Sequence, residues 1–364
     1  MNRKFLKLSI GTFLAATTLT AQSKATESSV STLISRPPQF VMIGFDGGLD
    51  PAQWQATRDF AKELNSESKT IHFTYFISGA YLLRDANRNI YQPPKHKIGY
   101  SAIGFGGNST QVADRMKQIN SAFSEGHEIA NRGNGHFNGK QEKWNESDWT
   151  QELKQFSDLL FGVYFNNNIT PDRQYTQGFA FKEKDIVGFR APQLGANDAL
   201  FPALKSQLIK YDISTVTNDT QWPAMDKYGI WRLSIPMIEL GDTGKHITGL
   251  DYNFYYTQSG AKPDLENKDH YKSEMLHSYR KYFAKNYFAG RAPIKIGHHF
   301  ENFNGGAYWE ALKDFATEVC GKPEVQCVTY KEYVEWLDSL SPEIFEAYKE
   351  GRFERLPTSE EVQL

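Results

Sequence analysis

The segment Gly126–Gly139 reads G-H-E-I-A-N-R-G-N-G-H-F-N-G and follows a helical pattern at 111–124. Its start, His127–Ala130, is short and apolar like a strand, and the remainder is rich in glycine and asparagine. That composition predicts a turn with unusual backbone angles or a close approach to another group. Turns after the carboxyl ends of strands often carry function in α/β folds. His127 and His136 are therefore either functional residues or ordinary structural histidines.

Strand and helix patterns alternate on both sides of this segment. The run Gln39–Phe45 is continuously apolar, as expected of a strand that is buried on both faces, and it ends at Asp46. Further strands are expected at 71–77, 127–130, 186–189, 211–216, 231–238 and 293–297. Helices are expected at 51–64, 111–124, 148–164, after 197, and at 264–287, 307–319 and 330–337, with Asp50, Ser147, Asn197 and Thr329 as their caps. This alternation predicts one α/β domain, and about seven strands favour a (β/α) barrel over the alternative, an open parallel α/β sheet.

The ends of the chain differ from this pattern. Residues 1–25 combine an early positive charge with a short apolar run at Leu8–Leu19, which predicts a signal peptide; the alternative is a buried N-terminal helix. Residues 26–38 are expected to be a linker, 39–340 the barrel domain, and 341–364 a C-terminal helix and tail. No later apolar run has the length of a membrane span. The expected location is therefore outside the cytoplasm, either periplasmic or secreted.

Composition narrows the classes of partner. The chain has 364 residues and a net charge of −2, which does not favour binding to nucleic acid. Aromatic residues make up 14% of the chain, and they suit either sugar-ring contacts or core packing. No pattern favours a particular oligomeric state. The two cysteines, Cys320 and Cys327, are close in sequence and are expected to form one structural disulfide in an exported protein.

Polar residues follow several of the expected strands. Asp46 ends the first strand, His136 lies beyond the third, Arg190 ends the fourth and His298 ends the last. In a barrel these carboxyl ends meet on one face, so an acid, two imidazoles and a guanidinium would lie close together. Such a set is suited to hydrolysis. Serine-nucleophile chemistry is not favoured, because the chain has no G-x-S-x-G segment.

Five motifs in order carry a family resemblance. They are F-D-G-G at 45–48, G-H-E-I-A-N-R-G-N-G-H at 126–136, F-R-A-P at 189–192, Y-D-I-S-T at 211–215 and I-G-H at 296–298. Together they resemble the polysaccharide deacetylases of the NodB-homology type, carbohydrate esterase family 4, over about 40–337. The resemblance implies a distorted (β/α)7-type barrel. It also implies removal of N-acetyl groups from N-acetylglucosamine polymers, such as peptidoglycan or chitin, with a divalent metal held by one Asp and two His.

The resemblance assigns roles to several residues. Asp46 would be the general base, Arg190 would orient it, and His298 would be the general acid. Gln193 would offer its backbone N–H to the oxyanion. Asp212 and Trp222 match the block that steadies the acid histidine and walls the acetyl pocket.

Two positions depart from the family pattern. Gly47 stands where the family has a metal-binding Asp, and Arg132 stands where it has the first metal-binding His, so His136 is the one matching ligand. One imidazole does not suffice, because catalytic zinc sites take three protein ligands. Arg132 would either repel a cation or pair with Asp46. The resemblance therefore implies a zinc-like metal that these two residues argue against.

These observations leave three hypotheses. The first is an exported N-deacetylase with Asp46 as base, His298 as acid and an altered metal site. The alternative is a non-catalytic glycan-binding protein on a deacetylase scaffold. The third is a hydrolase that uses Asp46 and His298 without a metal. The orientation of Arg132 distinguishes them.

Overall fold

A computed structural model of the protein describes residues 34–67 and 69–356. The predicted signal peptide, most of the predicted linker and the end of the predicted tail lie outside these residues. Within them, no helix has both the length and the apolar character needed to cross a membrane.

The described strands form one main sheet and one smaller sheet. The main sheet runs β11-β1-β2-β3-β4-β5-β8-β7, with β12 also paired to β1. Its strands are β1 Gln39–Gly47, β2 Thr74–Ile77, β3 Glu128–Asn131, β4 Gly188–Phe189, β5 Tyr211–Asp212, β7 Ala224–Met225, β8 Trp231–Arg232, β11 Ile294–His299 and β12 Val325–Cys327. From β11 to β8 every neighbouring pair is parallel, and β7 is antiparallel to β8. The smaller sheet, in the order β10-β9-β6, contains β6 Val216–Asn218, β9 Ile235–Glu239 and β10 His246–Thr248.

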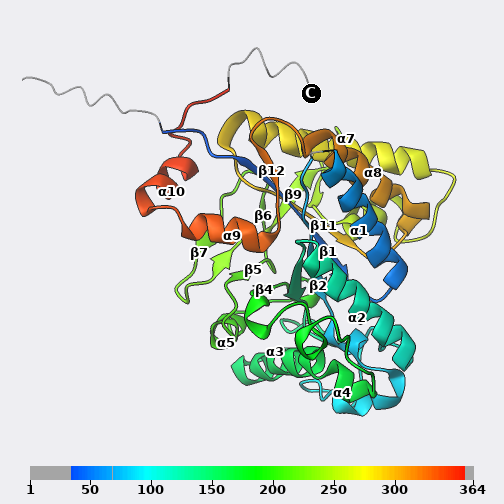
Figure 1. Ribbon diagram of the computed structural model, residues 1–364. Helices are drawn as coiled ribbons and strands as arrows, with labels where there is room; N and C mark the ends of the chain where they lie inside the picture. The colour runs from blue at the N-terminus through cyan, green and yellow to red at the C-terminus, as the bar shows by residue number, and fades with distance from the viewer. Residues whose placement is uncertain (1–33, 68, 357–364) are drawn as a thin grey trace, which may run out of the picture. The chain divides into compact units, whose positions relative to one another are not determined.

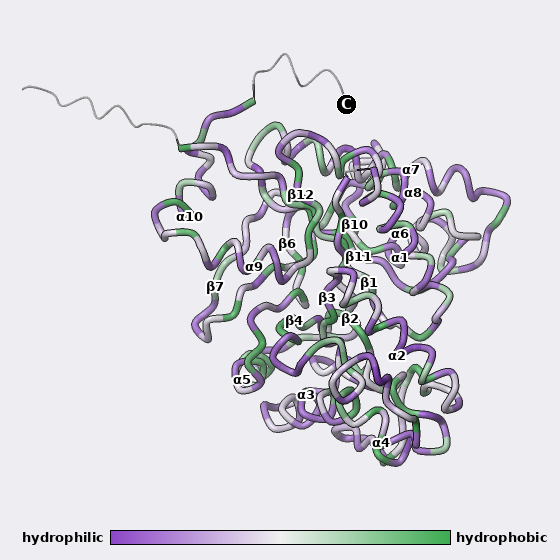
Figure 2. Tube along the Cα trace, in the orientation of Figure 1, coloured by the Kyte–Doolittle hydropathy of each residue, from purple (hydrophilic) through white to green (hydrophobic). Residues whose placement is uncertain are grey.

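Helices surround these strands, and the main sheet curls into a distorted barrel (Figure 1). They are α1 Pro51–Ser66, α2 Ser109–Ser124, α3 Glu146–Phe161, α4 Val163–Asn167, α5 Leu200–Ser206, α6 Asp251–Ser259, α7 Lys268–Lys285, α8 Phe303–Val319, α9 Tyr330–Asp338 and α10 Pro342–Lys349. The α/β class and the barrel are thereby confirmed, and the open-sheet alternative is not needed. Figure 2 shows hydrophobic residues concentrated along the central strands and hydrophilic residues on the outer loops.

The two faces of β1 pack against different groups of side chains. Val41, Ile43 and Phe45 belong to the cluster beneath the outer helices, where Phe45 contacts Trp309 of α8. Phe40 and Met42 point into the barrel and pack with aromatic residues of α9. Because successive side chains of a strand alternate in direction, Asp46 continues the inward-facing row. This alternation places a carboxylate above an apolar plug in the barrel.

Several predicted elements differ from the observed ones. The expected strand 211–216 is divided between β5 and β6, and 231–238 is divided between β8 and β9, because the chain leaves the barrel to build the smaller sheet. The strand expected at 71–77 starts at Thr74, although Ile71 forms an isolated bridge with Cys327. α6 was not predicted, since its sequence D-Y-N-F-Y-Y-T-Q-S has no clear helical spacing of apolar residues.

Two predicted helix caps are wrong. Asn145, rather than Ser147, caps α3 through a capping box with Asp148. Asn197 does not cap α5: its side chain accepts a hydrogen bond from Trp149 Nε1 and donates one to the Trp144 carbonyl oxygen. Both asparagines thus form hydrogen bonds at the start of α3.

The predicted disulfide is confirmed. Cys320 and Cys327 are bonded, with their Cα atoms 5.7 Å apart. The bond joins the end of α8 to β12, and β12 pairs with β1. It therefore fastens an outer helix to the central strand of the barrel.

Candidate functional site

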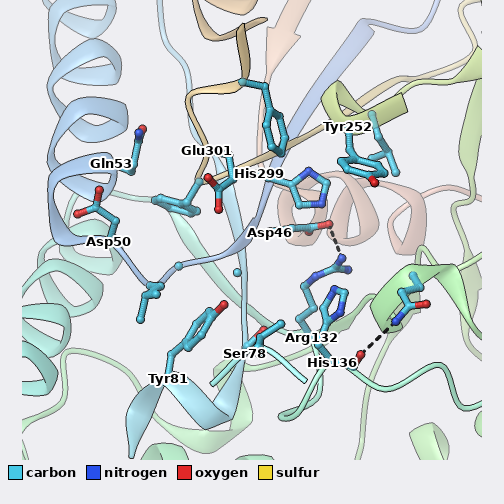
Figure 3. Close-up of a pocket in the computed structure, with 18 of the residues that line it drawn as sticks. Asp46, Asp50, Gln53, Ser78, Tyr81, Arg132, His136, Tyr252, His299 and Glu301 are labelled. Atoms are coloured by element: carbon cyan, nitrogen blue, oxygen red, sulfur yellow. Dashed lines mark hydrogen bonds and ion pairs between the residues drawn. The ribbon is translucent and has the colours of Figure 1, made fainter. Parts of the chain in front are cut away.

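A cavity of about 900 Å³ opens at the carboxyl ends of the parallel strands. Asp46 and Gly47 of β1, Arg132 after β3, and His299 of β11 line its inner part (Figure 3). Ser78 and Tyr81 line it from the turn after β2, and Tyr252 lines it from the start of α6. The sequence prediction that the strand ends build one site is consistent with this cavity.

Asp46 lies between two guanidinium groups. Its Oδ1 accepts a hydrogen bond of 2.7 Å from Arg190 Nη1. Its Oδ2 forms an ion pair with Arg132 Nη2 at 3.1 Å, shown as a dashed line in Figure 3. All three side chains are at least nine-tenths buried. Both carboxylate oxygens of Asp46 therefore face a guanidinium group at the inner end of the cavity.

Both arginines are fixed by the ends of their strands. Arg190 follows β4, and its guanidinium stacks on the Phe76 ring at 4.1 Å from the centroid. Arg132 follows β3, and its backbone N–H donates to the Ile77 carbonyl oxygen. Burial lowers the pKa of Arg132, although Asp46 opposes this effect, and a guanidinium remains charged in proteins. Arg132 thus places a permanent positive charge in the cavity.

His298, the acid histidine expected from the motif, does not line the cavity, whereas the adjacent His299 does. The parallel register pairs Phe45 with His298 and Asp46 with His299. His298 therefore faces the same way as Phe45, toward the helices, where its Nε2 shares a 3.0 Å hydrogen bond with the Tyr279 hydroxyl. Burial lowers the pKa of His298 to about 4. His299 instead faces the cavity beside Asp46.

His299 forms a close pair with a carboxylate that sequence reasoning missed. Its Nδ1 lies 2.6 Å from Asp251 Oδ1, and its backbone N–H donates to Asp251 Oδ2 at 2.8 Å. Burial acts to lower the pKa of His299, but Asp251 more than compensates, so the pKa is raised overall. His299 is thereby favoured as an imidazolium paired with Asp251. The two adjacent histidines at the end of the strand could have indicated this alternative, because neighbouring residues of a strand face opposite sides of the sheet.

His136 lies on the cavity in a turn that its neighbours constrain. It has a φ of 61°, which is uncommon for a residue other than glycine. Gln193, also on the cavity, donates from Nε2 to the His136 carbonyl oxygen at 3.2 Å. Burial lowers the pKa of His136 to about 4, and the nearby Arg132 adds to the effect. His136 is therefore a neutral imidazole near neutral pH.

A buried glutamate of α3 anchors this turn. Glu152 Oε1 accepts a hydrogen bond from the Asn134 backbone N–H at 2.7 Å, and its Oε2 accepts one from the Tyr91 hydroxyl at 2.8 Å. The Asn134 side chain donates to the Glu152 carbonyl oxygen. Glu152, which sequence reasoning did not single out, thus anchors the turn at Asn134.

Gly47 has a backbone that only glycine adopts easily. Its φ is 102°, and a Cβ added there would have the Tyr81 ring as its nearest neighbour, at 3.9 Å. Space for a side chain is therefore present, whereas the backbone conformation opposes one.

Two of the predicted substrate-binding residues lie away from the cavity. Asp212 is buried, accepts a hydrogen bond from the Ser214 hydroxyl and lies 3.3 Å from Arg232 Nε. Trp222 donates to the Gly290 carbonyl oxygen and stacks with Tyr348 of α10. Neither lines the cavity. In this chain the side chains of Asp212 and Trp222 make contacts within the protein instead.

The side chains present do not fit a divalent metal. Within the described part of the chain, no three His, Cys, Asp or Glu side chains are arranged to hold an ion. His136 is the one predicted ligand that faces the cavity, and Arg132 holds the carboxylate that a metal would need. A cation placed there would meet the Arg132 guanidinium.

Comparisons with known proteins give likenesses of structure. No protein-family model and no curated protein matches the chain. A candidate polysaccharide deacetylase from Mycobacterium smegmatis is 14% identical, with a TM-score of 0.47, over 85% of this chain and 97% of that one. The peptidoglycan deacetylase PdaC from Bacillus subtilis is 13% identical, with a TM-score of 0.41, over 85% and 94%. A CE4 family pseudoenzyme from Bacillus anthracis is 9% identical, with a TM-score of 0.41, over 82% and 66%.

In fold, this chain is similar to the polysaccharide deacetylases. At these identities the likeness concerns the fold alone, and one fold can host many functions. We therefore take the function from the residues of the cavity.

Proposed function

We propose that this protein binds an N-acetylglucosamine-containing glycan, such as peptidoglycan or chitin, without hydrolysing it. The observation that carries the proposal is the double ion pair of Asp46 with Arg132 and Arg190. It occupies the place where a deacetylase of the resembled family would keep its base and metal. The alternative that the sequence left open is thus favoured over the N-deacetylase.

The ion pairs occupy Asp46. A general base must reach the proton that it accepts, and here Arg132 and Arg190 contact the two carboxylate oxygens. Amide hydrolysis by this family relies on a metal to lower the pKa of the attacking water. The side chains in the cavity do not fit a metal, and His298, the expected acid, faces the helices. Three parts of the deacetylase mechanism are therefore compromised.

The cavity has features that suit sugar rings. Tyr252, which lines the cavity, is 45% exposed, and Tyr81, Phe300 and Phe303 also line the cavity. Aromatic faces with a polar end suit carbohydrate, which presents both C–H groups and hydroxyls. Arg132, His299, Gln53 and Asn253 supply donors around them.

The test combines a binding assay with an activity assay. Calorimetric titration with chitotetraose should show saturable binding, and Tyr252→Ala should weaken it roughly ten-fold, which corresponds to about 1.4 kcal/mol of lost ring contact. Tyr256→Ala is a matched control, because Tyr256 is 63% exposed on the same helix and does not line the cavity. Acetate release should be absent with zinc, cobalt, manganese or nickel. Metal-dependent acetate release would overturn the proposal.

A metal-independent hydrolase is the second candidate. The His299–Asp251 pair favours it, because a protonated histidine held by a carboxylate at the cavity can act as a general acid. This candidate keeps the proposed substrate and replaces His298 by His299. Acetate release that persists in EDTA and disappears in His299→Gln, but not in His298→Gln, would support it.

We further propose that the protein acts outside the cytoplasm. The signal-like sequence of residues 1–25 supports this, and so does the disulfide, since such bonds persist in oxidising compartments. Fractionation of cells expressing the full chain tests it. Recovery of the unprocessed protein in the cytoplasm would contradict it.

A further inference from the structure

The buried charges at the inner end of the cavity do not balance. The single carboxylate of Asp46 faces two guanidinium groups, from Arg132 and Arg190. The shorter contact, 2.7 Å, is with Arg190, which does not line the cavity. The neighbouring His299 is matched by Asp251. One positive charge therefore remains, and the side chain that presents it to the cavity is Arg132.

A second, independent feature lies beside this charge. Ser78 is 1% exposed, lines the cavity and has no hydrogen-bond partner for its Oγ within the described residues. Its backbone N–H already donates to the Gly47 carbonyl oxygen, which fixes the residue next to Asp46. A buried hydroxyl without a hydrogen-bond partner is costly, so a ligand group that bonds to the Ser78 hydroxyl would remove this cost. Its O–H can donate to an anion.

The acidic side chains of the cavity lie farther out. Asp50 and Glu301 also line it, and both are exposed to solvent. Asp50 caps α1, where its side chain accepts from the Ala52 backbone N–H. Charges in water are screened far more than buried ones. The buried charges at the inner end therefore determine which charged group of a ligand is favoured there.

We propose that the inner end of the cavity binds a carboxylate of the glycan, with Arg132 and Ser78 as its main partners. The ligand is then an acidic glycan that carries a uronate or another carboxylated sugar. This inference rests on the proposed glycan binding and narrows its ligand class. A planar guanidinium suits a carboxylate through its paired N–H donors.

Calorimetric titration of the whole protein with four tetrasaccharides tests the inference. Chitotetraose is neutral and its deacetylated form is cationic. Two probes alternate N-acetylglucosamine with glucuronic acid or with N-acetylmuramic acid, and they distinguish the two sources of carboxylate. At low salt, at least one carboxylated probe should bind ten-fold or more tightly than chitotetraose. The preference should decrease as salt is added.

Three variants separate the inference from a general loss of structure. Arg132→Gln should abolish the preference, because it should weaken binding of the carboxylated probe at least ten-fold more than binding of chitotetraose, whereas Arg132→Lys should retain part of the preference. Ser78→Ala should reduce the preference without changing any charge. Arg173→Gln is the control, because Arg173 is exposed and outside the cavity. Equal affinity for neutral and carboxylated probes, or tighter binding of the cationic one, would overturn the inference alone. Binding of none of the four would overturn the proposed function.

Discussion

Asp46 shows how a buried carboxylate is kept in a barrel. A buried carboxylate needs partners to offset its loss of water, and Arg132 and Arg190 contact the two oxygens of Asp46. The contacts differ, since Arg190 is fully buried and also stacks on Phe76, while Arg132 lines the cavity. Arg190 therefore has mainly a structural role, and Arg132 is available to a ligand.

Removing each arginine should therefore have a different cost. Arg190→Ala leaves Asp46 with its weaker partner and should reduce the free energy of unfolding by roughly 3–5 kcal/mol. Arg132→Ala should cost less, about 2 kcal/mol, because the contact that it removes from Asp46 borders the cavity, where water can replace it. Urea unfolding measures both, with the exposed Arg173→Ala as control. An Arg190 variant as stable as the unmodified protein would refute this account of Asp46.

The His299–Asp251 pair should make stability depend on pH. The pKa of His299 is raised in the folded protein above its ordinary value of 6.5, so the pair stabilises the fold fully below that value. The contribution is lost as pH rises through the folded pKa. Asp251→Asn should therefore cost more stability at pH of about 6 than at about 9, as measured by urea unfolding at each pH. An equal cost at both pH values would show that His299 is not charged in the fold.

Two substitutions should recreate a metal site. Gly47→Asp and Arg132→His together return the family ligands beside His136. The first should cost about 1–2 kcal/mol, because Gly47 has a φ of 102°. We expect about one zinc per chain by metal analysis after dialysis, and none in Arg132→His alone, since zinc sites of this kind need three ligands. A folded but metal-free double variant would mean that the three positions do not converge.

At the scale of elements, the site depends on α3 and α6 as much as on the strands. α3 carries Glu152, which anchors the turn of His136, and α6 begins with Asp251 and Tyr252. The strand ends and the turns after them carry the side chains that line the cavity, and these two helices carry the residues that hydrogen-bond to them or to their turns. A change in either helix should therefore alter the site without changing the barrel.

The capping of α3 offers a test at this scale. Asn145→Ala removes a side-chain acceptor from the Asp148 backbone N–H and should cost about 1 kcal/mol. Ser147→Ala is the matched control, because Ser147 lies inside the helix, and it should change stability by less than about 0.5 kcal/mol. Thermal unfolding of both variants decides between the two caps. The larger loss in Ser147→Ala would support the cap expected from sequence.

At the scale of the whole molecule, apolar packing holds the barrel together. The two faces of β1 join separate clusters, and α9 fills the barrel below Asp46. The disulfide adds a link between α8 and β12. The cavity above can therefore change its chemistry while the fold stays the same.

Ligand and chelator should act differently on the folded state. Prolonged dialysis against EDTA should leave the midpoint of thermal unfolding unchanged. Chitotetraose at a hundred times its dissociation constant should raise the free energy of unfolding by about 2.7 kcal/mol, because it binds the folded state alone. Calorimetric unfolding measures both effects. A clear fall of the midpoint in EDTA would indicate a structural metal.

The sequence by itself determined the α/β class, the disulfide between Cys320 and Cys327 and the position of Asp46 at a strand end. These follow from local patterns: apolar runs, cysteine spacing and the alternation of strands with helices. Sequence reasoning also singled out Arg132 as the residue whose orientation distinguishes the functional hypotheses.

Only the tertiary structure decided which histidine faces the cavity and what Arg132 contacts. His298 and His299 are adjacent, so the choice between them depends on the register of β11 against β1, which the motif does not contain. Asp251 reaches His299 from an unpredicted helix 48 residues earlier in the chain. Arg132 and Asp46 are brought together by the parallel strands β3 and β1, which lie on either side of β2. Local patterns predict elements, whereas ion pairs between distant segments depend on how those elements pack.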